Sequence, residues 1–363
     1  MPDILPLRSQ FRGCLLGGAV GDALGAPVEF DTHARIVARY GHNGPSELGR
    51  AYGVDGAITD DTQMTLWTAE GLLRGAHRWE TRGIAHLPSM VHRAYVRWLL
   101  TQDEPFPFGE GGITRDSVAD GWLWRHQALH AQRAPGGTCL SALASGVMGT
   151  MEDPVNDSKG CGGVMRAAPA GLMFPPGRAF EVGCETAAIT HGHPTGYVAS
   201  GALAETVAQL MGGATVAEAL SAAEAAARAA EGGAETADAL VAAERLAGSS
   251  DTDAAAVQAL AVVTPGRGAG WVAEEALAVA ALCARRYPED AERAVRMAVT
   301  HTGDSDSTGS ICGQILGAAL GDEAIPARWV EAVELREVVI QIADDLWARA
   351  AGEHGWEARY PPG

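Results

Sequence analysis

The pattern of apolar and polar residues along the chain is typical of helices. Few segments show the alternation and β-branched enrichment of strands, whereas windows rich in Ala, Leu, Glu and Arg with helical spacing recur throughout. We therefore predict an all-α fold. Residues 202–247 are Ala-rich and nearly of low complexity, and the Gly232-Gly233 pair is expected to divide them into two helices.

The chain shows no convincing domain boundary. Loops rich in Pro and Gly are expected at residues 101–114 and 134–137, but neither resembles a long linker. A length of 363 residues suits one large domain or two ordinary ones. We therefore predict that residues 1–363 form a single domain, with its sequence motifs inside residues 11–321.

Two segments carry a glycine at every fourth position. In a helix this spacing places the glycines along one ridge, where a second helix can approach closely. Each glycine costs roughly 1 kcal/mol of helix propensity relative to alanine, so tight packing must offset that cost. The two stripes are Gly13, Gly17, Gly21 and Gly25, and Gly309, Gly313, Gly317 and Gly321.

Acidic residues crowd two predicted helix starts. The first is Thr59-Asp60-Asp61-Thr62, where the apolar spacing that follows predicts a helix beginning at or just after the aspartates. A single Asp or Thr there would usually be a helix cap, but two adjacent aspartates exceed what one cap needs. The second is Gly303-Asp304-Ser305-Asp306-Ser307-Thr308, which leads into the second glycine stripe.

The two acidic clusters would need cations if they came together. Four neighbouring carboxylates repel one another unless they are protonated or neutralised. Hard oxygen ligands select Mg²⁺, Mn²⁺ or Ca²⁺ over thiophilic metals. The residues alone leave open whether the clusters meet in the fold.

Three further segments are candidates for a site. A helix should end near Gly25 and Pro27 and leave Glu29 on an exposed segment, from which it could reach a site. Gly160-Cys161-Gly162-Gly163 is a glycine-rich turn before a predicted helix, a geometry that can cradle phosphate, although by itself the pattern is better explained as a plain turn. His191 and His193 have an H-x-H spacing, but no matching Cys or His cluster supports zinc.

The composition of the chain limits the classes of binding partner and the cellular compartment that we expect. The 27 basic and 45 acidic residues give a formal charge of −18, which disfavours general nucleic-acid and anionic-membrane binding. The six cysteines are scattered without a disulfide-like spacing, as expected of reduced thiols in the cytoplasm. The N-terminal residues lack the features of an export signal or anchor.

The motifs taken together resemble the ADP-ribosylglycohydrolase family, which includes the dinitrogenase reductase-activating glycohydrolases. In chain order they are GCLLGGAVGDALGAPVEF, ITDDTQMTL, GCGGVMRAAP, THGHP and HTGDSDSTGSICGQILGAALG. The resemblance extends from about Phe11 to about Gly321. The combination of T-D-D-T with G-D-x-D-S-T-G is specific, whereas either motif alone would not be.

The resemblance implies a compact all-α domain with two divalent cations, Mg²⁺ or Mn²⁺, in a cleft between the two acidic helix starts. It implies that Glu29 or Asp61 transfers a proton during catalysis, and leaves open which of them is the base. The loop Gly160, Cys161, Gly162 and Gly163 would receive the diphosphate of ADP-ribose, and His191 would line its site. The implied metal ligands are Thr59, Asp60, Asp61, Asp304, Asp306 and Ser307.

The implied reaction is hydrolysis of the glycosidic bond between ADP-ribose and a modified acceptor, with a protein arginine or serine favoured. Two other functions stay open. A non-catalytic ADP-ribose-binding protein could have the same fold, and Asp304-Ser305-Asp306-Ser307-Thr308 also fits the D-x-D-x-T pattern of phosphatases, although that motif should follow a buried strand. Neither the acceptor nor the oligomeric state can be derived from the sequence.

Overall fold

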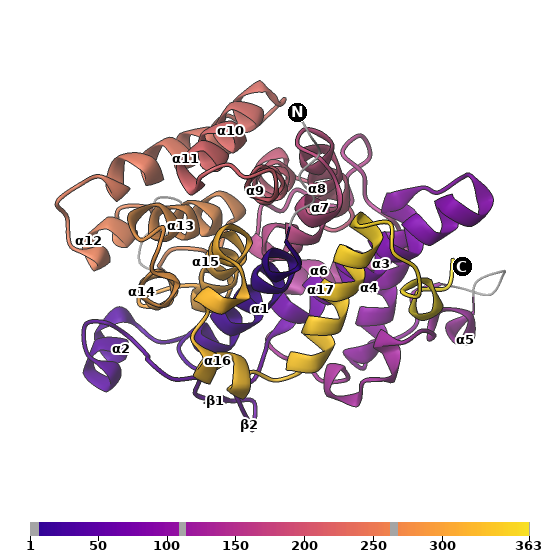
Figure 1. The fold of residues 1–363 in the computed structure, drawn as a ribbon, viewed down its shortest axis with the longest axis horizontal. Helices are drawn as coiled ribbons and strands as arrows, with labels where there is room; N and C mark the ends of the chain where they lie inside the picture. Colours follow the sequence, from indigo (N-terminus) through magenta and orange to yellow (C-terminus); the bar gives the residue numbers. More distant parts are fainter. Residues whose placement is uncertain (1–6, 109–113, 262–267, 363) are drawn as a thin grey trace.

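The computed structural model describes residues 7–108, 114–261 and 268–362. Helices dominate these residues, which confirms the expected all-α fold (Figure 1). Two short antiparallel strands, β1 (Arg50–Ala51) and β2 (Val54–Asp55), form a hairpin. Short 3₁₀ helices cover Leu123–Arg125, Gln127–Leu129, Cys161–Arg166, Asp322–Ala324 and Glu357–Arg359. The α-helices are α1 (Arg8–Gly25), α2 (His33–Tyr40), α3 (Asp60–Arg82), α4 (Leu87–Thr101), α5 (Arg115–Val118), α6 (Gly137–Ala144), α7 (Ala168–Met173), α8 (Arg178–Ala188), α9 (Pro194–Met211), α10 (Val216–Ala229), α11 (Ala234–Ala247), α12 (Asp253–Gln258), α13 (Ala273–Arg286), α14 (Ala291–Ala298), α15 (Ser305–Leu320), α16 (Ala327–Ala332) and α17 (Arg336–Ala350).

The Ala-rich segment, residues 202–247, is predicted to form two helices. It contains the end of α9 and then the two helices α10 and α11. The Gly232-Gly233 pair separates α10 from α11 as predicted, and Gly232 has a left-handed backbone with φ of 71°. A second break at Gly212-Gly213 ends α9, because Gly213 also takes a left-handed conformation, with φ of 90°. The prediction missed this break. Thr215 and Glu218 then form a capping box that starts α10.

The two glycine stripes pack against each other. Helices α1 and α15, far apart in sequence, lie side by side in the middle of the molecule (Figure 1). A Cβ atom at Gly17 would lie 2.2 Å from the carbonyl oxygen of Gly313, and one at Gly21 would lie 2.0 Å from that of Gly309. Only glycine permits this approach, so the predicted close packing of each stripe is confirmed and its partner is the other stripe.

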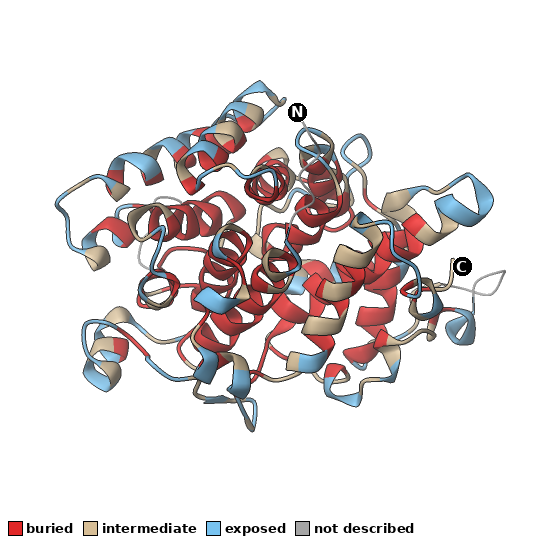
Figure 2. Cartoon of the chain, in the orientation of Figure 1, coloured by how far each residue is buried: buried red, intermediate tan, exposed pale blue. Residues whose placement is uncertain are grey.

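Buried apolar side chains form a core around this helix pair. One cluster extends along the chain from Phe11 to Tyr360, and Figure 2 shows the buried residues concentrated in the central helices. A small separate cluster consists of Val96, Leu100 and Val118. The assignment of residues 1–363 to one domain stays a prediction, which this shared core supports.

Two expected loops agree with the structure where it describes them. Residues 102–108 follow the end of α4 without regular structure, and residues 134–136 precede α6. The remaining expectations for residues 1–6 and 109–113 lie outside the described residues. Among the described residues, no helix is both long and apolar enough to cross a membrane.

Candidate functional site

The two acidic helix starts meet in the fold. Asp60 opens α3 and Asp304 precedes α15, and both carboxylates are buried. The side chain of Thr59 lies near enough to Asp306, across the two elements, to lower the pKa of that carboxyl, whereas burial, the largest cause, raises it. Burial and, next, the charge of Asp306 raise the pKa of both Asp60 and Asp61 well above the usual range. The question that the sequence left open is therefore answered.

Helix capping uses only part of this polar cluster. The Thr59 hydroxyl accepts a hydrogen bond from the backbone N–H of Asp61 at 3.3 Å, and the Asp304 carboxylate accepts one from Ser307 at 3.4 Å. Asp60 Oδ2 accepts from the N–H of Gly136 at 3.2 Å. Asp61 Oδ1 is buried and has no hydrogen-bond partner among the residues that the structure describes. An unpaired buried carboxylate oxygen is costly, so this position favours a bound cation or proton.

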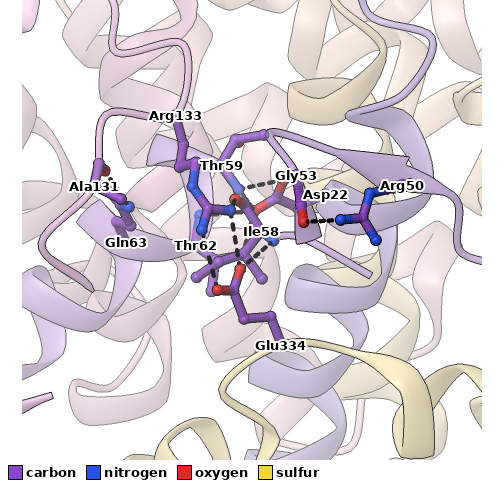
Figure 3. A network of polar contacts seen from close by, with 10 residues as sticks. All are labelled: Asp22, Arg50, Gly53, Ile58, Thr59, Thr62, Gln63, Ala131, Arg133 and Glu334. Atoms are coloured by element: carbon purple, nitrogen blue, oxygen red, sulfur yellow. Dashed lines mark hydrogen bonds and ion pairs between the residues drawn. The ribbon is translucent and has the colours of Figure 1, made fainter. Parts of the chain in front are cut away.

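Asp22, which the sequence analysis did not select, organises the first acidic helix start. Its carboxylate accepts hydrogen bonds from the backbone N–H of Thr59 at 3.0 Å and of Thr62 at 3.1 Å, and also from the Thr62 hydroxyl (Figure 3). Burial and the charge of Asp306 raise the pKa of Asp22 to about 7. A charged residue inside the glycine stripe was the available sequence signal, because a buried helix face tolerates a carboxylate only when donors meet it.

We expect Asp22→Ala to lower the free energy of unfolding by about 3 kcal/mol, because two buried N–H groups would lose their acceptor. Asp22→Asn keeps one acceptor oxygen and should cost less. Urea unfolding of the two variants and the wild type measures the difference. Equal stability of Asp22→Ala and the wild type would contradict this role.

A second network ties the loop before α6 to the start of α3. The guanidinium of Arg133 forms an ion pair with Glu334 at 3.0 Å and donates to the carbonyl of Ile58 at 3.3 Å (Figure 3). Glu334 also accepts from the Ile58 N–H at 3.2 Å. The Arg133 carbonyl accepts from the N–H of Asp60 at 3.0 Å. The acidic helix start is thus held from three parts of the chain.

Glu29 corrects one prediction, because its side chain is buried rather than exposed, with 6% of its surface accessible. The neighbouring Phe30 stacks on Trp271 with ring centroids 6.2 Å apart. In the described part of the chain, Glu29 Oε2 has no hydrogen-bond partner. Burial, followed by the charges of Asp306 and Asp304, raises the pKa of Glu29 to about 11. Glu29 therefore belongs to the carboxylate cluster.

The glycine-rich segment borders the same cluster. Residues Cys161–Arg166 form a 3₁₀ helix rather than a plain turn, and the predicted helix follows as α7. The Cys161 thiol donates to Asp304 Oδ2 at 2.9 Å. A Cβ atom at Gly162 would lie 3.0 Å from His191 Cε1, so the loop and this ring are in close contact. Bare glycine backbone therefore lies between the carboxylates and His191.

The two histidines of the H-x-H pattern have different surroundings. His191 Nδ1 is 2.8 Å from the Thr190 hydroxyl, and burial together with the charge of Arg166 lowers the pKa of His191 to about 3. Its imidazole is therefore neutral at physiological pH. His193 Nδ1 accepts from the N–H of Thr195 at 3.1 Å and caps α9. This cap explains His193 without a metal.

The chemistry of the acidic cluster fits a hard divalent cation. Its donors are carboxylate and hydroxyl oxygens, and Asp61 Oδ1 is buried with no hydrogen-bond partner in the parts of the chain that are described. In the described part of the chain, no group of three or more His, Cys, Asp or Glu side chains is arranged so that it could hold a metal ion by itself. The hydroxyls of Thr59 and Ser307 would therefore have to complete the donor set.

Comparison with known proteins gives the family. The family model described as ADP-ribosylglycohydrolase matches residues 4–355. The chain belongs to the ADP-ribosylglycohydrolase family. The resemblance inferred from the motifs is thereby confirmed, and family membership supports hydrolysis of ADP-ribose linkages in general.

Individual relatives of this ADP-ribosylglycohydrolase family member match it over most of their length. The ADP-ribosyl-[dinitrogen reductase] glycohydrolase of Rhodospirillum rubrum is 25% identical over 333 residues, covering 91% of this chain and 92% of its own. An uncharacterized protein of Archaeoglobus fulgidus is 28% identical over 356 residues, covering 94% and 97%. A solved structure described as an ADP-ribosylglycohydrolase-related protein complex has 27% identity and a TM-score of 0.58, covering 94% of this chain and 98% of that one.

Proposed function

We propose that this protein is a metal-dependent hydrolase that cleaves the glycosidic bond between ADP-ribose and a modified acceptor, and so reverses ADP-ribosylation. The observation that carries the proposal is the convergence of buried carboxylates from two helix starts beside a glycine-rich loop. A cluster of this kind is costly for stability unless it serves a ligand. Family membership supports the reaction class.

The cofactors that we propose are two divalent cations, Mg²⁺ or Mn²⁺. Bound cations would supply Lewis-acid chemistry, polarising a water molecule and holding the ribose hydroxyls. The oxygen-rich donor set, with no neutral imidazole or free thiolate among the proposed ligands, supports hard cations. The proposed ligands are Thr59, Asp60, Asp61, Asp304, Asp306 and Ser307.

Proton transfer in this proposal falls to Glu29 or Asp61. Glu29 Oε2 and Asp61 Oδ1 are both buried and have no hydrogen-bond partners in the described ranges, so each side chain has an oxygen available to accept or donate a proton. Ionised carboxylates at these two positions would stabilise a positive charge developing on a ribose bound beside them. We propose both as catalytic residues and do not divide the roles of acid and base between them.

The glycine loop is the proposed ADP-ribose site. Backbone N–H groups of Gly160, Cys161, Gly162 and Gly163 would bind the diphosphate, because a bare backbone can approach phosphate closely. His191, held neutral by burial, would line the same site without adding a charge. The close contact of Gly162 with His191 supports this grouping.

The acceptor that we favour is a protein arginine, with serine as the alternative. Phe30, which follows Glu29 in the sequence, is 71% exposed, and Tyr52 is 43% exposed. Tyr52 lies near Glu29, because the charge of Glu29 adds to burial in raising the pKa of Tyr52. Aromatic faces beside carboxylates suit a planar cationic guanidinium better than a neutral hydroxyl. The relative from Rhodospirillum rubrum carries dinitrogen reductase in its name.

We also propose a cytoplasmic location, supported by six cysteines that are all free.

Two other functions are less well supported. A D-x-D-x-T phosphatase would place its first aspartate after a buried strand, whereas Asp304 follows α14 in a helical fold. A non-catalytic ADP-ribose reader would not need both Glu29 and Asp61 to keep free buried oxygens. Turnover separates a reader from an enzyme.

The test is release of free ADP-ribose from arginine-linked and serine-linked targets with Mg²⁺ or with chelator. We expect release from the arginine-linked target that chelator abolishes and that Asp304→Ala reduces at least about a hundredfold, because Asp304 is buried in the donor set. Glu231→Ala, which removes an exposed carboxylate, serves as the control. Tight ADP-ribose binding without release from either target would identify a reader instead.

A further inference from the structure

A pocket of about 530 Å³ lies at the far end of α3 from the acidic cluster. Gly75, Ala76 and Trp79 of α3 form one wall, and residues from α4, α8, α17 and the segment 149–152 form the others. Asp61 and Ala76 are 15 positions apart on α3, which corresponds to about 22 Å along a helix. The pocket is therefore separate from the proposed active site, and its size is in the range of small-molecule sites.

The walls of this pocket are mainly apolar. Leu87, Met173 and Phe174 contribute side chains from the α4 start and the α7 end. Trp79 is 61% exposed and Met151 is 37% exposed, so this pocket presents apolar surface to solvent. A ligand with an apolar body would cover them.

Arg349 supplies a positive charge inside these apolar walls. Its side chain donates a hydrogen bond to the Met173 carbonyl at 3.5 Å and has no carboxylate within ion-pair distance among the described residues. Burial lowers the pKa of Arg349, with an opposing contribution from Glu80. By contrast, Arg178 in the same pocket pairs with Glu181 at 2.8 Å and Glu185 at 3.0 Å.

We propose that this pocket binds a small-molecule carboxylate with an apolar body, held by an ion pair with Arg349. A guanidinium that is partly removed from water, with no carboxylate of the described residues within ion-pair distance, can bind a carboxylate through two parallel hydrogen bonds. A single negative charge fits better than a dianionic phosphate, because Glu152 and Glu185 also line the pocket. This proposal does not depend on the proposed hydrolase function.

Calorimetric titration of the full chain with 3-phenylpropanoate and with its neutral amide, 3-phenylpropanamide, tests the proposal. We expect the carboxylate to bind about tenfold to a hundredfold more tightly than the amide. Arg349→Gln should remove this difference, while Arg328→Gln, which changes an exposed arginine outside the pocket, should preserve it. Ala85→Phe, which fills the pocket, should weaken binding of both probes.

Several outcomes would overturn the proposal. These are the absence of carboxylate binding to the wild type at millimolar concentration, equal binding of acid and amide, and unchanged binding to both Arg349→Gln and Ala85→Phe. Within residues 7–108, 114–261 and 268–362, Arg349 has a single long hydrogen bond, so its replacement should leave the fold intact, which the melting temperature checks. The Ala85→Phe variant tests the pocket independently of that charge.

Discussion

Asp61→Asn is expected to stabilise the metal-free protein by about 1–2 kcal/mol while it reduces ADP-ribose release at least about a hundredfold. The pKa of Asp61 is raised well above its usual range by burial first, and then by the charges of Asp306, Asp60, Asp22 and Asp304. Asparagine keeps the shape and removes that charge. The same charge is what a divalent cation would need, so stability and activity should change in opposite directions.

Urea unfolding in chelator and in Mg²⁺ measures both parts of this effect. The wild type should gain stability when Mg²⁺ replaces chelator, because a ligand that binds only the folded state stabilises it. Asp61→Asn should gain much less. Asp157→Asn, at an exposed position, controls for the loss of one acidic charge. If Asp61→Asn were less stable than the wild type in chelator, repulsion within the cluster would not be the dominant force there.

Gly17→Ala is expected to destabilise the protein by about 3 kcal/mol or more. The added Cβ atom would lie 2.2 Å from the carbonyl oxygen of Gly313, and a backbone atom of a buried helix cannot move aside as a side chain can. The helix pair α1 and α15 would have to separate. Because Asp22 and Asp306 belong to this pair, ADP-ribose release should fall together with stability.

Gly75→Ala is the matched control for this substitution, since it also adds a methyl group to a buried helical glycine. Its new Cβ atom would meet Leu87 Cδ2 at 2.7 Å, the end of a flexible side chain that can turn away. Thermal and urea unfolding of both variants gives the comparison. Similar losses of stability in the two would show that the close contact between the glycine stripes is not the cause.

The start of α3 shows how much of the site local sequence predicts. Thr59 is a helix-capping residue, and the apolar spacing after Asp61 requires a helix, so its start at Asp60 follows from nearby residues alone. The glycine stripes likewise predicted close helix packing, because a row of residues without Cβ atoms lets a second helix approach and tight packing must offset the lost helix propensity. Motif order then indicated the family.

What the sequence by itself determined is therefore the helices, the two acidic helix starts and the family. Only the tertiary structure decided that the stripes pack on each other, that Glu29 is buried with the aspartates, and that Asp22 receives the backbone N–H groups at the α3 start. The physical reason is the range of the interactions. Helix capping and periodicity act within a few residues, whereas burial, charge repulsion and close backbone packing depend on segments that only the fold brings together.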